Sequence, residues 1–469
     1  SCSKEDREKG FCWCVNPPSL ALPHLLTSPS ALKTHTDELH ANLLANIFTE
    51  TSELANFTRI MSVLPPLLQA EHHTWQFLME DPESPMLVEE RLMVAIMAAT
   101  RHHCEYFTKK LLLRALVTPT FPQSWLDGPL PPKFEAFATL VALLAHRPWQ
   151  ITPQHIADVL DADVTPPPTS SNSAAGEPEL EPWNLTSVVH AVCIATNVIS
   201  LCGFATLFQI PFEPSTAALP MELGQPEQVY LRTAENVTLN DNATANESGG
   251  SAPVMNYSNI PFHRFRPQQT NCTDMWTILT GEAGDGQCAP AADIGTYDKR
   301  IKRVDKKSER DKNSVDIGNF SWENHACTVI ENHYPGVASC MAEEKASYEE
   351  ITSAMETSAM RFRGTGACPQ AEEDDEVWRG VSVYIHNLFG VTHPDFDYGT
   401  INKLLDKEVK RFIHKATAVP EDTIVEDFHW TTPNVDPVLY VAVGAISARR
   451  EAMLLQFTYH FDKYLREYC

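Results

Sequence analysis

The sequence has no C-x-x-C pair, and its 12 cysteines are spread widely along the chain. C-x-C occurs once, at Cys12 and Cys14. Because structural zinc sites need tighter paired spacing than this, the sequence predicts no metal site, and nothing in it implies another cofactor. The even cysteine count leaves disulfide bonds as an alternative, and eight N-x-S/T sequons would fit a secreted chain.

Basic side chains are also scarce, with 36 Lys and Arg against 61 Asp and Glu and a net charge of -25. Nucleic acids and anionic membranes are themselves negative, so this excess argues against either as the main partner. The basic cluster at 299–307 is the exception. We interpret it as a solvated linker segment, with a nuclear-import or nucleic-acid patch as the alternative.

No secretory leader pattern is visible in the first residues. We therefore expect a cytoplasmic protein, with the nucleus as a second compartment. The longest uncharged run, 185–212, is long enough to span a bilayer. Polar residues interrupt it and no Lys or Arg flanks it closely, so we interpret it as a buried core helix rather than a membrane span.

Strand-like alternation dominates nowhere, and helical periodicity recurs in two long regions, which predicts an all-α fold. Stretches rich in Pro, Ser, Asn and Thr separate these regions and are typical of flexible or disordered segments. In chain order, the predicted parts are a loose N-terminal arm at 1–35, a helical domain at 36–212 with a disordered insertion at 164–181, a flexible connector at 213–316, and a second helical domain at 317–469.

The segment 85–117 carries the most specific chemistry. Its apolar residues recur at helical spacing, and Ser84 can cap it, so we predict one long helix. Arg101 precedes Cys104 by three residues on the same face and would lower the pKa of the thiol. Cys104 and Tyr106 would point to opposite sides of an unbroken helix, so they can act together only if the helix bends or ends there. The alternative is a buried structural cysteine.

The sequence IMAATRHHCEY at 96–106 resembles the redox-helix motif of the sestrins, whose N-terminal half is similar to the alkylhydroperoxidase D family. LAHRPWQITPQHI at 144–156 is similar to a second signature of the sestrins. The resemblance continues through 182–206, 319–345 and 382–410. It implies two related alkylhydroperoxidase D-like helical domains joined by the connector, the first of redox type and the second binding ligand and partner.

The resemblance implies that Cys104 attacks a peroxide as a thiolate and that Tyr106 supports the reaction. The family places a proton-relay histidine seven residues after the cysteine, where this chain has Leu111. His102 or His103 would be the substitutes. Because a leucine cannot relay a proton, we expect weak alkyl hydroperoxide reduction or none.

Sestrins that sense leucine hold the free amino acid in a C-terminal pocket. Such a pocket needs a cation for the carboxylate, an anion for the ammonium group, hydroxyl groups and apolar walls. The resemblance implies Trp430, Arg379, Thr352 and Asp436 for these tasks. Trp430 matches the family pattern, whereas the other residues are shifted or replaced. The expected ligand is therefore leucine, another amino acid or none.

The turn Asp395-Phe396-Asp397-Tyr398 resembles the D-D-Y-D-Y turn with which family members contact the GATOR complex, upstream of the target-of-rapamycin kinase. Pro394 stands where the family has the first acid. Because aspartate readily closes turns, a structural Asx-turn is the alternative.

The function implied by the resemblance is a stress-responsive regulator that restrains target-of-rapamycin signalling. The alternatives are a cysteine-dependent alkyl hydroperoxide reductase and a helical interaction protein with neither activity.

Overall fold

The structure is a computed structural model, and it describes residues 38–51, 53–62, 64–102, 104–127, 130–162, 180–213, 314–356, 371–405, 407–418 and 436–468. The predicted arm at 1–35, most of the insertion at 164–181 and most of the connector at 213–316 lie outside the described residues.

The described chain is mostly helical and has almost no strand, which confirms the predicted all-α class. The N-terminal half contains α4 (Glu38–Thr51), α5 (Asn56–Met61), α6 (Pro65–Met79), α7 (Val88–Arg101), α8 (Glu105–Val117), α9 (Ser124–Asp127), α10 (Pro132–His146), the 3-10 helix η1 (Pro148–Gln150), α11 (Pro153–Leu160) and α12 (Leu185–Leu207). The C-terminal half contains the π-helix η4 (Trp322–Ala326), α17 (Cys327–His333), α18 (Val337–Glu356), α19 (Ala371–Leu388), α20 (Tyr398–Leu404), α21 (Lys407–Ala418) and α22 (Asp436–Tyr468).

The strands β1 (Val315–Asp316) and β2 (Val391–Thr392) form a parallel pair with Val315 opposite Val391. Sequence reasoning missed this pairing, because segments of two residues show no alternation. The pair connects the start of the C-terminal half to the end of α19.

Local signals place several helix ends where the sequence predicts them. Thr152 precedes Pro153 at the first position of α11, and its backbone N–H donates to His155 Nδ1 over 3.1 Å. At α12, the side chain of Asn184 accepts from the backbone N–H of Ser187 over 2.8 Å. These bonds satisfy backbone groups that a helix start leaves without a partner.

The prediction of one helix over 85–117 is wrong, because α7 ends at Arg101 and α8 begins at Glu105. Ser84 does not cap α7, which begins at Val88. Instead, the carboxylate of Glu90 accepts from the backbone N–H of Leu87 over 3.1 Å.

The segment 401–413, whose apolar pattern on its own predicts one helix, is also interrupted. It divides between α20 and α21, and Leu405 takes an extended conformation at the end of α20. In both places the apolar periodicity runs across the break, so the pattern alone gave no sign of it.

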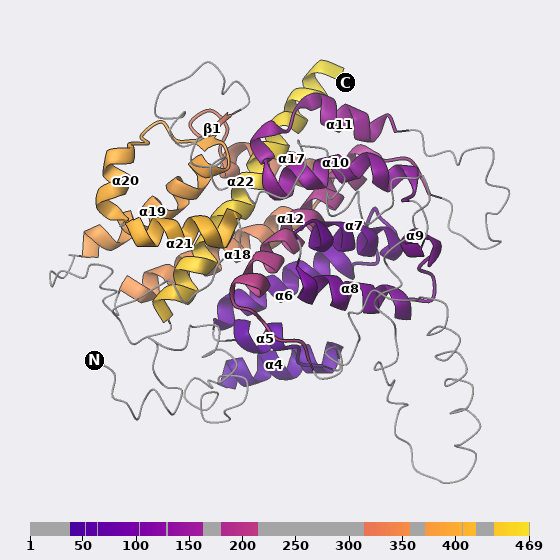
Figure 1. The fold of residues 1–469 in the computed structure, drawn as a ribbon, viewed down its shortest axis with the longest axis horizontal. Coiled ribbons are helices and arrows are strands. Elements are labelled where there is room, and N and C mark those ends of the chain that lie inside the picture. The colour runs from indigo at the N-terminus through magenta and orange to yellow at the C-terminus, as the bar shows by residue number, and fades with distance from the viewer. Residues whose placement is uncertain are drawn as a thin grey trace, which may run out of the picture.

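Helix α12 occupies the centre of the molecule, where it packs against α7 on one side and against α22 on the other (Figure 1). It has the length and composition of a membrane span, yet it is buried within the protein. Its interpretation as a core helix is therefore supported.

A second long contact pairs α18 with α6, so helices from both halves of the sequence share one buried apolar cluster (Figure 1). A separation into two domains stays a prediction.

Candidate functional site

The break between α7 and α8 places Cys104 directly at the N-terminus of α8. Cys104 is the N-cap residue of this helix, has an extended backbone (φ -84°, ψ 96°) and is 2% exposed. Helix N-termini carry a partial positive charge and free N–H groups, which stabilise a thiolate. The end of α7 before Cys104 also meets the condition stated from the sequence, that the helix must bend or end there if Cys104 and Tyr106 act together.

The pKa of the Cys104 thiol lies below its usual value. Burial acts to raise this pKa, but the thiol of Cys202, the hydroxyl of Thr206 and the backbone N–H groups of Phe107 and Tyr106 donate to the sulfur and outweigh burial. Arg101, the cause predicted from the sequence, is not among these largest causes. The site is therefore built across two helices, α8 and α12.

Cys202 has the opposite character to Cys104. It is fully buried, and burial raises its pKa well above the usual value, so it stays a neutral thiol that donates to Cys104. Sequence reasoning missed Cys202, because it lies in an apolar helix that showed no chemical motif.

The Tyr106 hydroxyl is hydrogen-bonded to a carboxylate. It donates to Glu213 Oε1 over 2.7 Å and accepts from the backbone N–H of Phe57 over 3.3 Å. Glu213 also accepts from the backbone N–H of Asn56 over 2.8 Å and pairs with Lys110 over 3.2 Å. The hydrogen bonds of Tyr106 and Glu213 therefore connect the segment after α12 to α5 and α8. Sequence reasoning assigned Glu213 to the start of the connector and missed this role.

Burial raises the pKa of Tyr106 far above its usual value, and the charge of Glu213 adds to this effect. The phenol therefore keeps its proton throughout the physiological range. In the structure, the Tyr106 hydroxyl positions Glu213 and the backbone of Phe57.

Of the residues considered for the proton relay, the structure describes Leu111 and His102. Leu111 is 2% exposed and lies on α8. His102 Nε2 accepts from Arg449 Nη1 over 2.9 Å, so this ring atom is occupied. His103 lies outside the described residues.

Arg449 connects the C-terminal helix α22 to the residues between α7 and α8. Besides its bond to His102, it donates to the backbone carbonyl of Ala145 over 2.6 Å and lies 5.4 Å from the ring centre of Phe389. Charged residues between the apolar stretches of a helix, as at 449–451, are a signal that could have identified it, because a buried charged side chain needs partners.

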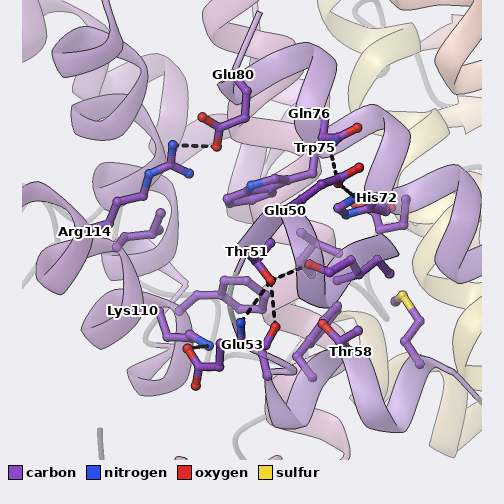
Figure 2. A pocket seen from close by; sticks show the side chains of 18 of the residues that line it. Glu50, Thr51, Glu53, Thr58, His72, Trp75, Gln76, Glu80, Lys110 and Arg114 are labelled. Atoms are coloured by element: carbon purple, nitrogen blue, oxygen red, sulfur yellow. Dashed lines mark hydrogen bonds and ion pairs between the residues drawn. The ribbon is translucent and has the colours of Figure 1, made fainter. Parts of the chain in front are cut away.

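A cavity of about 690 Å³ lies beside this site, between α4, α5, α6 and α8 (Figure 2). Tyr106, Phe107 and Leu201, which lie close in sequence to Cys104 and Cys202, form part of its wall. Its size is typical of sites for small molecules.

Of the implied leucine-site residues, Arg379 is the one whose side chain is placed. It is 66% exposed on α19 and forms an ion pair with Asp395. Thr352 lies on α18 and Asp436 is the first residue of α22, but their side chains are not among those described, and Trp430 lies outside the described residues. The ligand site therefore stays a prediction.

The acidic turn lies at the surface between β2 and α20. Asp397 is the N-cap of α20, and its carboxylate accepts from the backbone N–H groups of Gly399 over 2.9 Å and Thr400 over 3.2 Å. The Thr400 hydroxyl donates to it over 2.8 Å, and these bonds lower the pKa of Asp397. The Asx-turn role weighed as an alternative is thus present in the structure. Tyr398 is half-buried, with Lys410 Nζ 5.5 Å from its ring centre.

Among the described residues, no group of three or more His, Cys, Asp or Glu side chains is placed to hold a metal ion.

The described chain is a mostly helical protein with Cys104 at an internal helix N-terminus, and comparison with known proteins gives the family. The family model described as PA26 p53-induced protein (sestrin) matches residues 26–282 and 288–465. The chain belongs to the sestrin family, which confirms the resemblance seen in its motifs.

Individual relatives match over nearly the whole chain. Sestrin-1 of Macaca fascicularis is 25% identical over 464 residues, which cover 91% of this chain and 87% of that protein. Sestrin-3 of Mus musculus is 23% identical and covers 90% of this chain and 88% of its own length. Sestrin-2 of Homo sapiens is 22% identical, with 92% of this chain and 89% of that protein covered.

Proposed function

We propose that this protein is a stress-responsive regulator that restrains target-of-rapamycin signalling in the cytoplasm by binding the GATOR complex. Its membership of the sestrin family carries the proposal, because the match extends over both halves of the chain. The turn 394–398 is the proposed contact. Asp395 and Asp397 are exposed beside the half-buried ring of Tyr398, and an accessible aromatic residue with a polar rim is typical of interfaces.

The ion pair between Arg379 and Asp395 would connect the two functions proposed for the C-terminal half. Arg379 is the implied ligand for an amino-acid carboxylate, and Asp395 is an implied partner contact. An amino acid that captured Arg379 would release Asp395 from its present partner. Such an exchange costs little, because both side chains are more than half exposed.

Pull-down of the GATOR complex tests the partner contact. Asp395→Ala and Asp397→Asn should each weaken capture, and Asp397→Asn is chosen because asparagine caps a helix as well as aspartate does. Glu83→Gln, which changes an exposed acid in the loop before α7, is the matched control. Capture that is undiminished in both turn variants would place the contact elsewhere.

Calorimetry with a panel of free amino acids tests the sensing function on the same protein. Leucine or another amino acid should bind the wild type and bind Arg379→Ala more weakly. A chain that binds no amino acid, yet still captures the GATOR complex, would be a regulator without this sensing function.

Alkyl hydroperoxide reduction is the second candidate, and the lowered pKa of Cys104 at a helix N-terminus favours it. Leu111 in the relay position argues that turnover is slow. Leu111→His should increase peroxide turnover, and Cys104→Ser should abolish it. Equal turnover in Cys104→Ser and the wild type would exclude this chemistry.

A further inference from the structure

Two buried thiols meet where α12 packs against α8 (Figure 1). The sulfur of Cys104, at the N-terminus of α8, accepts a hydrogen bond from the thiol of Cys202 and another from the hydroxyl of Thr206. Cys202 and Thr206 are four residues apart in α12, so both lie on the same face of that helix. The Cys104 sulfur therefore lies against this face of α12, in contact with a second cysteine.

Hydrogen-bonded helical backbone holds both cysteines in place. The backbone N–H of Cys104 donates to the carbonyl of Ala99 in α7 over 3.1 Å, and its carbonyl accepts from the N–H of Thr108 in α8 over 3.0 Å. Cys202 lies inside α12, which extends from Leu185 to Leu207. The contact between the two thiols is therefore fixed by three helices.

Burial limits which thiols can reach Cys104 after it is oxidised. Cys104 is 2% exposed and Cys202 is 0% exposed. A cysteine oxidised to a sulfenic acid can condense with a thiol to form a disulfide bond. A tripeptide thiol such as glutathione is much larger than a small hydroperoxide, so burial hinders its approach far more. Burial therefore favours a thiol from inside the protein, and Cys202 is already in contact.

We propose that Cys202 is the resolving cysteine of Cys104: a hydroperoxide converts Cys104 to a sulfenic acid, and the Cys202 thiol condenses with it to form an intramolecular disulfide bond. This inference rests on the hydroperoxide chemistry proposed above as the second candidate function, and it adds the fate of the oxidised cysteine. The two residues come from different helices and share no sequence motif.

Two steps account for the atoms and electrons. In the first, the Cys104 thiolate attacks the terminal oxygen of the hydroperoxide ROOH. An S–O bond forms, the O–O bond breaks, and the alkoxide takes a proton and leaves as the alcohol ROH. In the second, the sulfur of Cys202 attacks the sulfur of Cys104. The S–S bond forms, the S–O bond breaks, and the hydroxide leaves as water with the proton of Cys202. The two sulfur atoms lose two electrons, and the peroxide oxygens gain them.

The first step prepares Cys202 for the second. Burial raises the pKa of Cys202 well above its usual value, and the hydrogen bond to Cys104 and the charge of that sulfur raise it further, whereas Arg449 of α22 opposes them. Arg449 comes close because Gly203 has no side chain, and its Nη1 atom lies 3.9 Å from the position that a Cβ atom would occupy there. Oxidation of Cys104 removes the thiolate charge. The pKa of Cys202 should then fall, which makes its thiolate more available.

Peptide mapping of the full chain tests the disulfide bond. The reduced protein is treated with hydrogen peroxide or, in a parallel sample, with tert-butyl hydroperoxide, and the remaining thiols are then blocked. Digestion with chymotrypsin, which cleaves after large apolar residues, separates Cys193 from Cys202 because Leu201 lies between them. We expect a pair of peptides that joins Cys104 to Cys202, and dithiothreitol should separate the pair.

Cys202→Ser shows the outcome without the second thiol. Its oxidised Cys104 should remain a sulfenic acid, so dimedone, which labels sulfenic acids, should mark Cys104 at least about tenfold more than in the wild type. Cys327→Ser in α17 is the matched control and should form the Cys104–Cys202 bond as the wild type does. The peptide map of the wild type needs no variant, so it stays decisive if Cys202→Ser does not fold.

The possible failures are distinguishable. Equal dimedone labelling of Cys104 in the wild type and in Cys202→Ser, without the joined peptides, would overturn the role of Cys202 and leave the hydroperoxide chemistry standing. A bond from Cys104 to any other cysteine would also overturn this role. The absence of both the joined peptides and the label, in both proteins and with either hydroperoxide, would overturn the inference together with the hydroperoxide reductase function.

Discussion

The Cys104 region and the turn 394–398 use the same kinds of polar groups in opposite surroundings. Around Cys104 the sulfur, the phenol of Tyr106 and the guanidinium of Arg449 are buried, and each has partners from distant parts of the chain. In the turn, Asp397 is bonded within its own neighbourhood and is exposed. Because the Cys104 region is buried, loss of any one partner there should lower the free energy of unfolding. Substitutions in the exposed turn 394–398 should change this free energy little. The predictions below test this difference.

Arg449→Met should have the largest effect on stability. The substitution leaves the carbonyl of Ala145 and Nε2 of His102 without their donor in the interior, so we expect a loss of about 3 kcal/mol in the free energy of unfolding. Urea unfolding measures this value. Arg466→Ala on the same helix is the control, because Arg466 is 76% exposed and pairs with Asp462 at the surface, and it should cost less than about 0.5 kcal/mol. Similar losses in both variants would contradict the comparison.

Tyr106→Phe should cost about 2 kcal/mol, because it removes a hydrogen bond to the buried carboxylate of Glu213. Tyr468→Phe, at an exposed position near the end of α22, is the control and should unfold like the wild type. If Tyr106→Phe keeps wild-type stability but loses peroxide turnover, Tyr106 acts in the chemistry and not in positioning.

Thr206→Val should raise the pKa of the Cys104 thiol, because the variant lacks a donor that stabilises the thiolate. At neutral pH, Cys104 should therefore react more slowly with iodoacetamide, while at high pH the two proteins should react alike. Mass spectrometry of each cysteine measures the rates, and Cys327, whose pKa is raised by burial, serves as the internal reference. An unchanged pH profile at Cys104 would remove Thr206 from the site.

Asp397→Ala should have the smallest effect, a lower thermal midpoint from the loss of the cap of α20. Asp397→Asn should keep the wild-type midpoint, because asparagine can accept the same backbone hydrogen bonds. Differential scanning calorimetry distinguishes them. Midpoints lowered equally in Asp397→Asn and Asp397→Ala would show that the charge of Asp397, and not the cap, stabilises the turn.

Helix positions could be predicted wherever local signals determine them. The start of α11 after Thr152 follows from its capping residue and Pro153, and α12 follows from an apolar run of suitable length. The break at 102–104 could not be predicted, because the apolar pattern continues from α7 into α8. At this break, Arg449 of α22 donates a hydrogen bond to His102, and no local pattern reveals this contact.

The candidate site shows the same division. Cys104 and Tyr106 could be selected from their motif, but their partners could not. Glu213 lies 107 residues after Tyr106, and Arg449 lies 347 residues after His102. Periodicity carries no information about contacts over such separations, so the sequence offered only the nearby Arg101 as a cause for the lowered pKa of Cys104.

The sequence by itself determined the helical class, the family and the choice of Cys104 as the candidate reactive cysteine. Each depends on residue types and spacings that are local in the chain. The tertiary structure alone decided that Cys104 stands at a helix N-terminus with Cys202 and Thr206 as donors. The physical reason is that pKa values and cavities depend on burial, and burial is set by how α6, α8, α12 and α22 pack together.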